Sequence, residues 1–418
     1  MTEAAVAQPN PLQRRTIQTL ASAQILSGLG YASTVAAGSL LVASISKSEA
    51  LAGLAQTFGV LGAATMALPL ANLTRRGGRR LALSSGYAIG AIGALVAVIG
   101  GTSRLVPVLL LGTFLVGAAS ASGYQARYAA TDLAGQHDRA RSLSLVVWAS
   151  TVGSVLGPNL MAPFGQFADS IGLPKLVGPY MFAALTLSLG ATVIRFRLKP
   201  DPYLTSIAST SEAKVNPVKV PTKEVMAHIR SHPLALLGLL AIAIGHIIMV
   251  SVMVMTPVHM AHYDVSLKII GLVISVHIAG MYAFSPIVGI LSDRWGRPRV
   301  IQIGAVILLS SALIAGTAPP HDHVRLGIGL FLLGLGWSCT LVAGSTLLSE
   351  SVSTHYRAAA QGTSDLIMNL SAAIGGAVAG LIIANLSYGW LCTIAAVPVC
   401  VLLGFATRQT LKRQTVQS

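Results

Sequence analysis

Two ionisable residues lie inside apolar stretches of the sequence, where an ion pair or a bound proton could do chemistry. Arg127 follows Tyr124 and Gln125, and Asp365 precedes Asn369 in equally apolar surroundings. A charged side chain inside hydrocarbon costs a few kcal/mol, so such a residue is expected to be paired and to serve a function. At about 1.5 Å per helical residue, Arg127 lies roughly 7–8 Å and Asp365 roughly 12 Å from the charged end of its segment.

Two histidines, His246 and His277, also lie in apolar stretches. A histidine can relay protons because its unperturbed pKa is about 6.5, but a lone buried histidine can equally be a hydrogen-bonded packing residue. The three cysteines have neither metal-ligand nor disulfide spacing, and the adjacent His321 and His323 are poor metal ligands. No H-E-x-x-H or G-x-x-x-x-G-K-[ST] motif occurs. The sequence therefore predicts no metal, no cofactor and no enzymatic activity.

The elements that carry these residues must cross a lipid bilayer. The chain has 418 residues, of which 53% are hydrophobic and only 10% are charged, and its mean hydropathy is +0.71. A soluble domain carries about 25% charged residues. The net charge of +15 could indicate nucleic-acid binding, but the lysines and arginines form short clusters between apolar stretches and no basic face. We therefore exclude nucleic acid as a partner and expect a multi-pass membrane protein.

Twelve stretches are apolar over the roughly 20 residues that a spanning helix needs. Most of the 28 lysines and arginines fall in the connections on the side of the N-terminus. Because positive charge favours the cytoplasmic side, we expect both termini in the cytoplasm and the chain in the cell membrane. The stretches lie near residues 16–43, 50–72, 80–101, 105–132, 140–164, 178–197, 235–257, 268–292, 300–317, 324–350, 358–385 and 387–407.

The two halves of the sequence repeat at an offset of 218 residues. The expected order is a cytoplasmic tail at 1–15, a six-helix bundle at 16–197, a polar linker at 198–234, a second six-helix bundle at 235–407 and a cytoplasmic tail at 408–418. The offset places Arg76, Gly78 and Arg79 on Arg294, Gly296 and Arg297, places Asp132 and Arg139 on Glu350 and Arg357, and places Gly157 on Gly375. Repeated halves are typical of alternating-access transporters, whose substrate site lies between the halves.

A basic turn at residues 289–299, GILSDRWGRPR, connects two of the apolar stretches. It closely resembles the signature loop G-x-L-x-D-R-x-G-R-[RK] of the major facilitator superfamily, and only Pro298 departs from it. With the twelve stretches and the repeat, the resemblance covers the whole chain. It implies an all-α membrane protein, with twelve transmembrane helices in two pseudo-symmetric six-helix bundles, that works as a secondary transporter.

The resemblance also implies a charged latch that closes the cytoplasmic side. Its expected members are Asp293, Arg294, Gly296 and Arg297 with Gly78, Arg79, Asp132, Arg139, Glu350 and Arg357. The first-half loop at 73–80, LTRRGGRR, is degenerate, because Arg75 stands where the family carries an aspartate. We therefore expect the second-half loop to carry more of the latch. The alternative is ordinary helix-end charge, worth only about 0–1 kcal/mol per exposed pair.

Gly153, Gly157 and Pro158 form a G-x-x-x-G-P motif that resembles one found in proton-coupled exporters of the same superfamily. Two glycines four residues apart also make a flat face for close helix packing, which is the alternative interpretation. The match is partial, because Met161 and Ala162 stand where the motif ends in two glycines. The R-x-x-Q-G motif of many drug–proton antiporters is absent, and only Gly117 survives from it.

Arg127 and Asp365 predict a switch in such a transporter. A bridge between them across the halves would stabilise the outward-facing state, and a proton or a substrate carboxylate could compete for it. The alternative is that each charge is satisfied within its own half by Gln125, Asn369 or a backbone carbonyl. Further candidates for lining the cavity are Gln24, Tyr31, Tyr124, Gln125, Trp148, Asn159, His246 and Asn369.

These observations together favour proton-coupled export of amphipathic or drug-like compounds by a monomer, with a small-molecule substrate and protons as partners. The alternative is a proton-coupled carrier of a specific metabolite, in which Arg127 binds an anionic group. A polytopic membrane enzyme or a receptor is a remote alternative, because no hydrolase motif and no added soluble domain is present.

Overall fold

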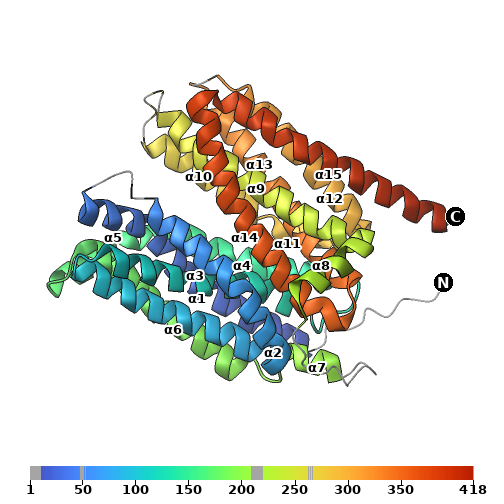
Figure 1. The fold of residues 1–418 in the computed structure, drawn as a ribbon, viewed down its shortest axis with the longest axis horizontal. Coiled ribbons are helices and arrows are strands. Elements are labelled where there is room, and N and C mark those ends of the chain that lie inside the picture. The colour runs from blue at the N-terminus through green and yellow to red at the C-terminus, as the bar shows by residue number, and fades with distance from the viewer. Residues whose placement is uncertain are drawn as a thin grey trace.

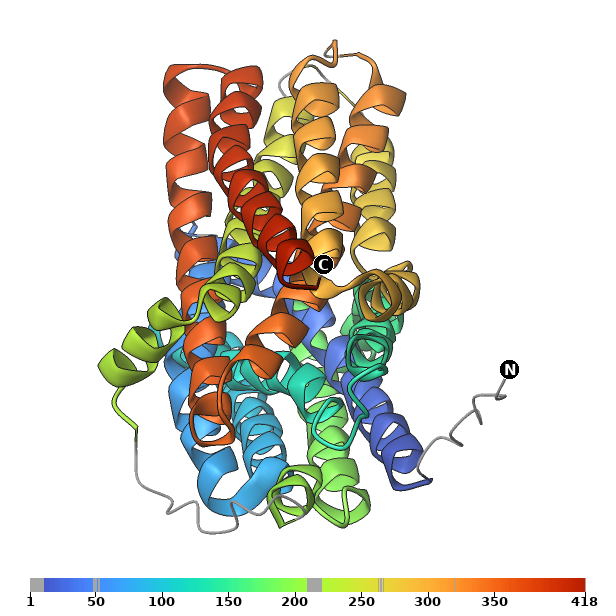
Figure 2. The same cartoon turned by 90° about the vertical axis from the view of Figure 1, so that its right-hand side faces the viewer.

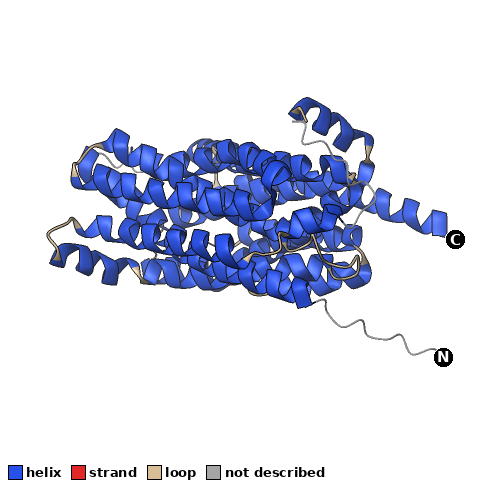
Figure 3. Ribbon diagram, turned by 90° about the horizontal axis from the view of Figure 1, so that it is seen from below, coloured by secondary structure: helices blue, strands red, loops and turns tan. Residues whose placement is uncertain are grey.

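The computed structural model describes residues 11–47, 51, 53–208, 220–261, 263, 265, 267–319 and 321–417, which fold into helices joined by turns (Figure 3). The first half contains α1 (Pro11–Ser46), α2 (Leu54–Thr102), α3 (Val106–Ala129), α4 (Arg139–Asn159), α5 (Met161–Ser170), the short 3-10 helix η2 (Lys175–Val177) and α6 (Gly178–Arg197). The second half contains α9 (Pro233–Ala261), α10 (Leu267–Tyr282), α11 (Ser285–Trp295), α12 (Arg297–Gly316), α13 (His323–Ser351), α14 (Thr354–Asn385) and α15 (Tyr388–Gln417).

Eleven helices in the described residues are long and apolar enough to cross a membrane. One of them, α2, holds two spans, because its backbone leaves the helical conformation at Gly78, where φ is 81° and ψ is 175°. A positive φ suits glycine, which has no Cβ to clash. The described residues therefore contain the twelve spans expected from the sequence, with a tight turn at Gly78 between the second and the third.

The helices form two bundles that lie against each other (Figures 1 and 2). Figure 1 shows the first half in blue to green and the second half in yellow to red. The start of α1 and the end of α15 lie at one end, together with two linker helices, α7 (Pro202–Ala208) and α8 (Thr222–Ser231) (Figure 1). We call this end the basic face, because Arg195, Arg197 and Arg294 lie in the last turns of their helices there, and Arg408 lies in the C-terminal third of α15.

The 218-residue repeat is visible in the packing of glycines. A Cβ added to Gly157 in α4 would lie 3.0 Å from Leu29 O in α1. A Cβ added to Gly375 in α14 would lie 3.0 Å from Ile247 O in α9. Leu29 and Ile247 are themselves 218 residues apart, so the first and fifth spans of each half pack with the same register. Two similar bundles follow from this repetition.

The halves meet closely near the basic face, where α11 contacts α4 and α14 contacts α2. A Cβ on Gly289 would lie 2.8 Å from Ala140 O, and a Cβ on Gly362 would lie 3.1 Å from Ala67 O. These added atoms would also collide with Ser144 and Ala71, respectively. The second half therefore contributes a glycine to each of these two contacts, α11 with α4 and α14 with α2, which we call the seams.

Several boundaries differ from those expected. The helix α1 begins at Pro11, and α15 remains helical to Gln417, within the stretch expected as a tail. The fifth span breaks at Leu160 between α4 and α5, three residues before Pro163, because a proline has no N–H to donate to the carbonyl four residues before it. The linker contains α7 and α8, while residues 209–219 lie outside the described residues.

Candidate functional site

A buried ion pair joins the two halves of the molecule. Arg127 Nη2 in α3 lies 2.7 Å from Asp365 Oδ1 in α14, and the two side chains are 2% and 1% exposed. The same Nη2 donates to the Tyr128 hydroxyl at 3.2 Å, and that hydroxyl donates to Ser364 Oγ at 3.4 Å. Two polar contacts therefore cross between α3 and α14 within a few residues of each other.

The ion pair is incompletely hydrogen-bonded. Within the described residues, Arg127 Nε and Asp365 Oδ2 have no hydrogen-bond partner. The amides that could have satisfied these charges bond elsewhere, since Gln125 donates to Ala67 O at 3.0 Å and Asn369 donates to the backbone oxygen of Asp365 at 2.7 Å. A buried polar atom without a partner costs free energy. The pair therefore keeps one donor and one acceptor that a ligand or a proton could satisfy.

A cavity of about 120 Å³ lies beside Arg127 at the interface between the halves. Four of its side chains are aromatic, namely Tyr31, Tyr124, Tyr282 and Trp337. The remaining lining is small, polar or aliphatic and consists of Gln24, Ser27, Gly28, Ala32, Ala119, Ser120, Gly123, Val146, Val147, Ser150, Ser154 and Leu341. Because aromatic faces, hydroxyls and one guanidinium surround this space, it suits a small planar molecule with a negatively charged group.

His246 lies behind the cavity wall and accepts a hydrogen bond from Trp337, which lines the cavity. Trp337 Nε1 donates to His246 Nδ1 at 2.9 Å, and Tyr282 meets the Trp337 ring edge-on with centroids 5.7 Å apart. A nitrogen that accepts a hydrogen bond carries no proton, so this contact requires Nδ1 of His246 to be unprotonated. His277 is fully buried within the second half, where its Nδ1 contacts Leu330 O at 2.8 Å.

The candidate cavity residues separate into those that line the space and those that do not. Gln24, Tyr31 and Tyr124 line it, and Gln24 also donates to Ser150 Oγ at 2.9 Å. Trp148, which is 42% exposed, is not part of the lining of this cavity. The side chain of Asn159 lies outside the described residues. Sequence reasoning missed Tyr282, Trp337 and Ser150, because no local pattern shows which way a residue in a uniformly apolar helix faces.

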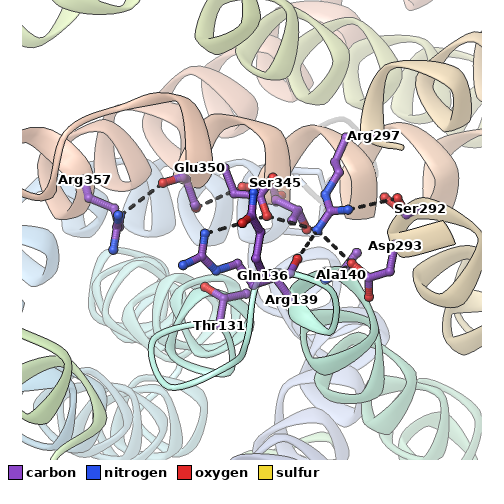
Figure 4. A network of polar contacts seen from close by, with 12 residues as sticks. Thr131, Gln136, Arg139, Ala140, Ser292, Asp293, Arg297, Ser345, Glu350 and Arg357 are labelled. Atoms are coloured by element: carbon purple, nitrogen blue, oxygen red, sulfur yellow. Dashed lines mark hydrogen bonds and ion pairs between the residues drawn. The ribbon is translucent and has the colours of Figure 1, made fainter. Parts of the chain in front are cut away.

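At the basic face, the second-half loop binds the start of a first-half helix. Asp293 accepts the backbone N–H groups of Ala140 at 3.1 Å and Arg141 at 2.8 Å, where α4 begins. A carboxylate at a helix N-terminus satisfies orphan N–H groups and is favoured by the helix dipole. Arg297 Nη2 lies 2.8 Å from Asp293 and 3.0 Å from Glu350, so it joins α11 to the end of α13 (Figure 4).

The same arginine reaches the first half directly. Arg297 Nη2 donates to Gln136 O at 2.8 Å, and Arg139 lies 3.7 Å from Glu350. Gly296 has a φ of 90°, which makes the sharp turn between α11 and α12. Arg294 points outward as an exposed residue in the last turn of α11, outside the network. The second-half loop therefore places Asp293, Gly296, Arg297, Arg139 and Glu350 together.

The first-half loop builds a related but more deeply buried contact. Arg79 binds Asp132 through two nitrogens, at 2.8 and 3.3 Å, and donates to Gln361 Oε1 of the second half at 2.6 Å. Burial raises the pKa of Asp132, and the Arg79 guanidinium acts against this rise. Within the described residues, Arg357 forms an ion pair with none of the three latch acids and instead donates to Ser349 O at 3.1 Å. Gly78 makes the turn that presents Arg79.

The glycine motif of the fifth span packs against the first span. A Cβ on Gly153 would lie 2.6 Å from Gly28 Cα, and one on Gly157 would lie 2.7 Å from Ala32 Cβ. Pro158 follows at the end of α4. Gly28 and Ala32 both line the cavity, so these glycines bring α1 and α4 together beside it.

Comparisons with known proteins cover almost the whole chain. The sequence profile of the Major Facilitator Superfamily matches residues 20–268 and 251–416. The uncharacterized MFS-type transporter YdeG of Bacillus subtilis (strain 168) is 37% identical over 397 residues, which are 93% of this chain and 92% of that protein. The riboflavin transporter RfnT of Brucella anthropi is 27% identical over 378 residues, which are 90% of each protein.

A solved structure shares the same arrangement of helices. The proton:xylose symporter XylE, bound to 6-bromo-6-deoxy-D-glucose, superposes with a TM-score of 0.72 and covers 95% of this chain and 96% of its own. Its sequence is only 13% identical, so the likeness concerns the fold.

Proposed function

The chain belongs to the Major Facilitator Superfamily of transporters, and from that premise we propose that it carries a small, planar, anionic solute together with a proton. Transport would proceed by alternating access, with the cavity between the halves as the substrate site. Asp365 would bind the proton, and Arg127 would bind the anionic group. We further propose that the basic face is cytoplasmic, because most lysines and arginines lie there.

The observation that carries this proposal is the incompletely bonded pair across the halves. While Asp365 is charged, it holds Arg127 at 2.7 Å. Protonation of Asp365 removes the negative charge that binds the guanidinium, and the cation is then left in need of another anion. A substrate carboxylate supplies that anion, so the proton and the substrate favour each other's binding. Because the bridge spans α3 and α14, its release also loosens the contact between the halves.

The size and lining of the cavity support a specific metabolite over a broad range of drugs. Its volume is about 120 Å³, whereas pockets that hold drug-sized ligands measure roughly 300–1,000 Å³. The four aromatic side chains favour a planar ring, since stacked or edge-on aromatic contacts add about 0.5–1.5 kcal/mol each. RfnT is named for riboflavin, which also has a planar ring system, so riboflavin belongs in the test panel.

The test is transport into proteoliposomes with an imposed proton gradient. The panel contains radiolabelled benzoate and other aromatic carboxylates, riboflavin, and a cationic dye. We expect a ring carboxylate to accumulate in response to the gradient. Asp365→Asn should lose this accumulation but retain exchange of labelled for unlabelled substrate, because the neutral amide leaves Arg127 available. Arg127→Ala should lose both activities.

The matched control is Asp169→Asn, which alters an acid that is 58% exposed in α5, at the end of the molecule away from the basic face (Figure 1). It should behave like the unmodified protein. Unchanged gradient-driven uptake in Asp365→Asn would rule out Asp365 as the proton site. Accumulation of several unrelated cationic dyes, with no carboxylate moved, would instead support the export of amphipathic compounds.

Export of amphipathic compounds is the second candidate function, and the glycine motif favours it. Gly153 and Gly157 pack directly behind the cavity wall at Gly28 and Ala32. A pliable wall at this position could admit larger ligands as the halves move. The dye arm of the same experiment distinguishes the two candidates.

A further inference from the structure

The loops of the two halves differ at the position that carries the acid in the second half. Asp293 in the second half binds the first turn of α4 and pairs with Arg297 four residues later. The residue 218 positions earlier is Arg75, whose side chain is 9% exposed and whose Nη2 has no partner within the described residues. The first-half loop therefore has no acid of its own with which to hold Arg79.

The start of α14 shows why the first half tolerates this loss. The residues equivalent to Ala140 and Arg141 are Ala358 and Ala359. Since α14 begins at Thr354, one turn earlier in the repeat than α4, these residues lie inside the helix. Their N–H groups bond to carbonyls four residues back and need no external carboxylate. An acid at position 75 is therefore not required to bind this helix.

An acid from the linker lies at the first-half loop instead. Asp201 Oδ2 accepts the N–H of Arg80 at 2.7 Å, in the first turn after Gly78. Asp201 Oδ1 accepts the N–H groups of Tyr203 at 3.0 Å and Leu204 at 3.1 Å, where α7 begins. One carboxylate thus binds the starts of two helices. A Cβ on Gly78 would lie 2.5 Å from Asp201 Cγ, so the glycine leaves room for it.

The linker also places an aromatic ring against the latch arginine. Tyr203 is 3% exposed, and its ring centroid lies 5.6 Å from Arg79 Cζ. Arg79 binds Asp132 in its own half and Gln361 in the other half. A guanidinium over an aromatic ring is attracted to it, more strongly where water is excluded. Asp201 fixes the backbone of Arg80, which follows Arg79 in the chain, and the backbone of Tyr203, whose ring contacts the Arg79 guanidinium.

We propose that Asp201 is a positioning residue of the first-half latch and substitutes for the aspartate missing at position 75. It holds α7 and the start of the third span together, and so aims Arg79 at Gln361 across the interface. Opening of the basic face must break the Arg79–Gln361 contact. Loss of Asp201 therefore shifts the protein toward the conformation that is open at the basic face, whichever solute it carries.

The test measures the distance between the halves with spin labels. The labels are attached at Arg195→Cys in α6 and Arg408→Cys in α15, two exposed residues at the basic face, after replacement of Cys339, Cys392 and Cys400 by alanine. Asp201→Asn should increase the ratio of long to short distances by about ten- to a hundredfold, the size expected for losing a charged hydrogen-bond acceptor. Asp201→Glu should keep most of the short population, and Asp169→Asn should leave the distribution unchanged.

Relocating the acid separates positioning from a merely structural contribution of the linker. In an Asp201→Asn background, Arg75→Asp places a carboxylate four residues before Arg79, as Asp293 precedes Arg297. This double variant should restore the short distances. Tyr203→Leu, which keeps the carboxylate, should shift the distribution in the same direction as Asp201→Asn and decides the matter if Asp201→Asn does not fold. The proposal is overturned if Asp201→Asn lowers thermal stability with an unchanged distance distribution, or if Arg75→Asp restores nothing.

Discussion

At the scale of single residues, the Arg127–Asp365 pair contributes little to the stability of the fold compared with the free energy needed to desolvate its two charges. Removing two charges from water is expensive, and a buried pair regains that energy only when every donor and acceptor is bonded. Arg127 Nε and Asp365 Oδ2 lack such bonds within the described residues. Apolar residues of similar volume could serve packing equally well. The pair is therefore better explained by a functional requirement than by a structural one.

His246 permits a prediction that separates positioning from proton relay. His246→Phe removes the acceptor of the Trp337 N–H, and an unsatisfied buried donor costs about 1–3 kcal/mol. We expect the KM for a ring-bearing substrate to rise about five- to a hundredfold, with the pH dependence of transport unchanged. His246→Gln, whose amide oxygen can accept the bond, should recover most of the affinity. The measurement is initial-rate uptake across a pH series.

An altered pH profile in His246→Phe would instead support the role in proton relay that the sequence also allowed.

The sequence could place His246 inside a span but could not show what its ring contacts. Trp337 is 91 residues away, and the bond depends on how α9 and α13 are rotated against each other. For the same reason Arg127 and Asp365 were identifiable as buried charges, whereas their contact required the assembled halves.

At the scale of helices, the glycines at the seams decide how closely the halves approach. Gly362 faces Ala67 and Ala71 of α2, while Gly376, further along α14, has no atom within 4 Å of an added Cβ among the described residues. Gly362→Leu should therefore oppose closure of the basic face by about 1–3 kcal/mol, the usual cost of overpacking. Gly376→Leu should leave closure unaffected. The labels at Arg195→Cys and Arg408→Cys report both outcomes.

Equal distance distributions in these two glycine variants would show that α14 does not form a tight seam when the face is closed.

The contacts between the helices could be predicted only in part from the sequence. The sequence located the loop at 289–299 and the glycines of α4, because fixed local spacing identifies both. It did not locate Asp201 as a loop partner, since that contact joins a linker to a turn 121 residues earlier. The break at Leu160 was also missed, because hydropathy stays high across it.

At the scale of the whole molecule, the structure is closed at the basic face. Both latches are formed, through Arg297 with Asp293 and Glu350, and through Arg79 with Gln361. The fold itself was predictable, because span length, apolarity and the repeat are properties of long stretches that tolerate local error. The number of spans was correct, although the second and third appear as one helix with a kink at Gly78.

Membrane orientation can be tested with reporter fusions. If the basic face is cytoplasmic, green fluorescent protein fused after Gln417 should fluoresce, because it folds in the cytoplasm. Alkaline phosphatase fused after Thr317, at the opposite end of α12, should be active, because it requires export. The reciprocal fusions serve as controls and should be silent. The reverse pattern would place the basic face outside and contradict the orientation proposed from the charge distribution.

The placement of the two seam glycines makes the halves complementary to each other. Gly289 meets Ser144, and Gly362 meets Ala71, so both glycines belong to the second half. Two copies of the first half would oppose Ala71 to Ser144 and clash, whereas two copies of the second half would oppose two glycines and leave a gap. At these contacts each half is therefore complementary to the other half and not to a copy of itself, as the subunits of an obligate heterodimer are.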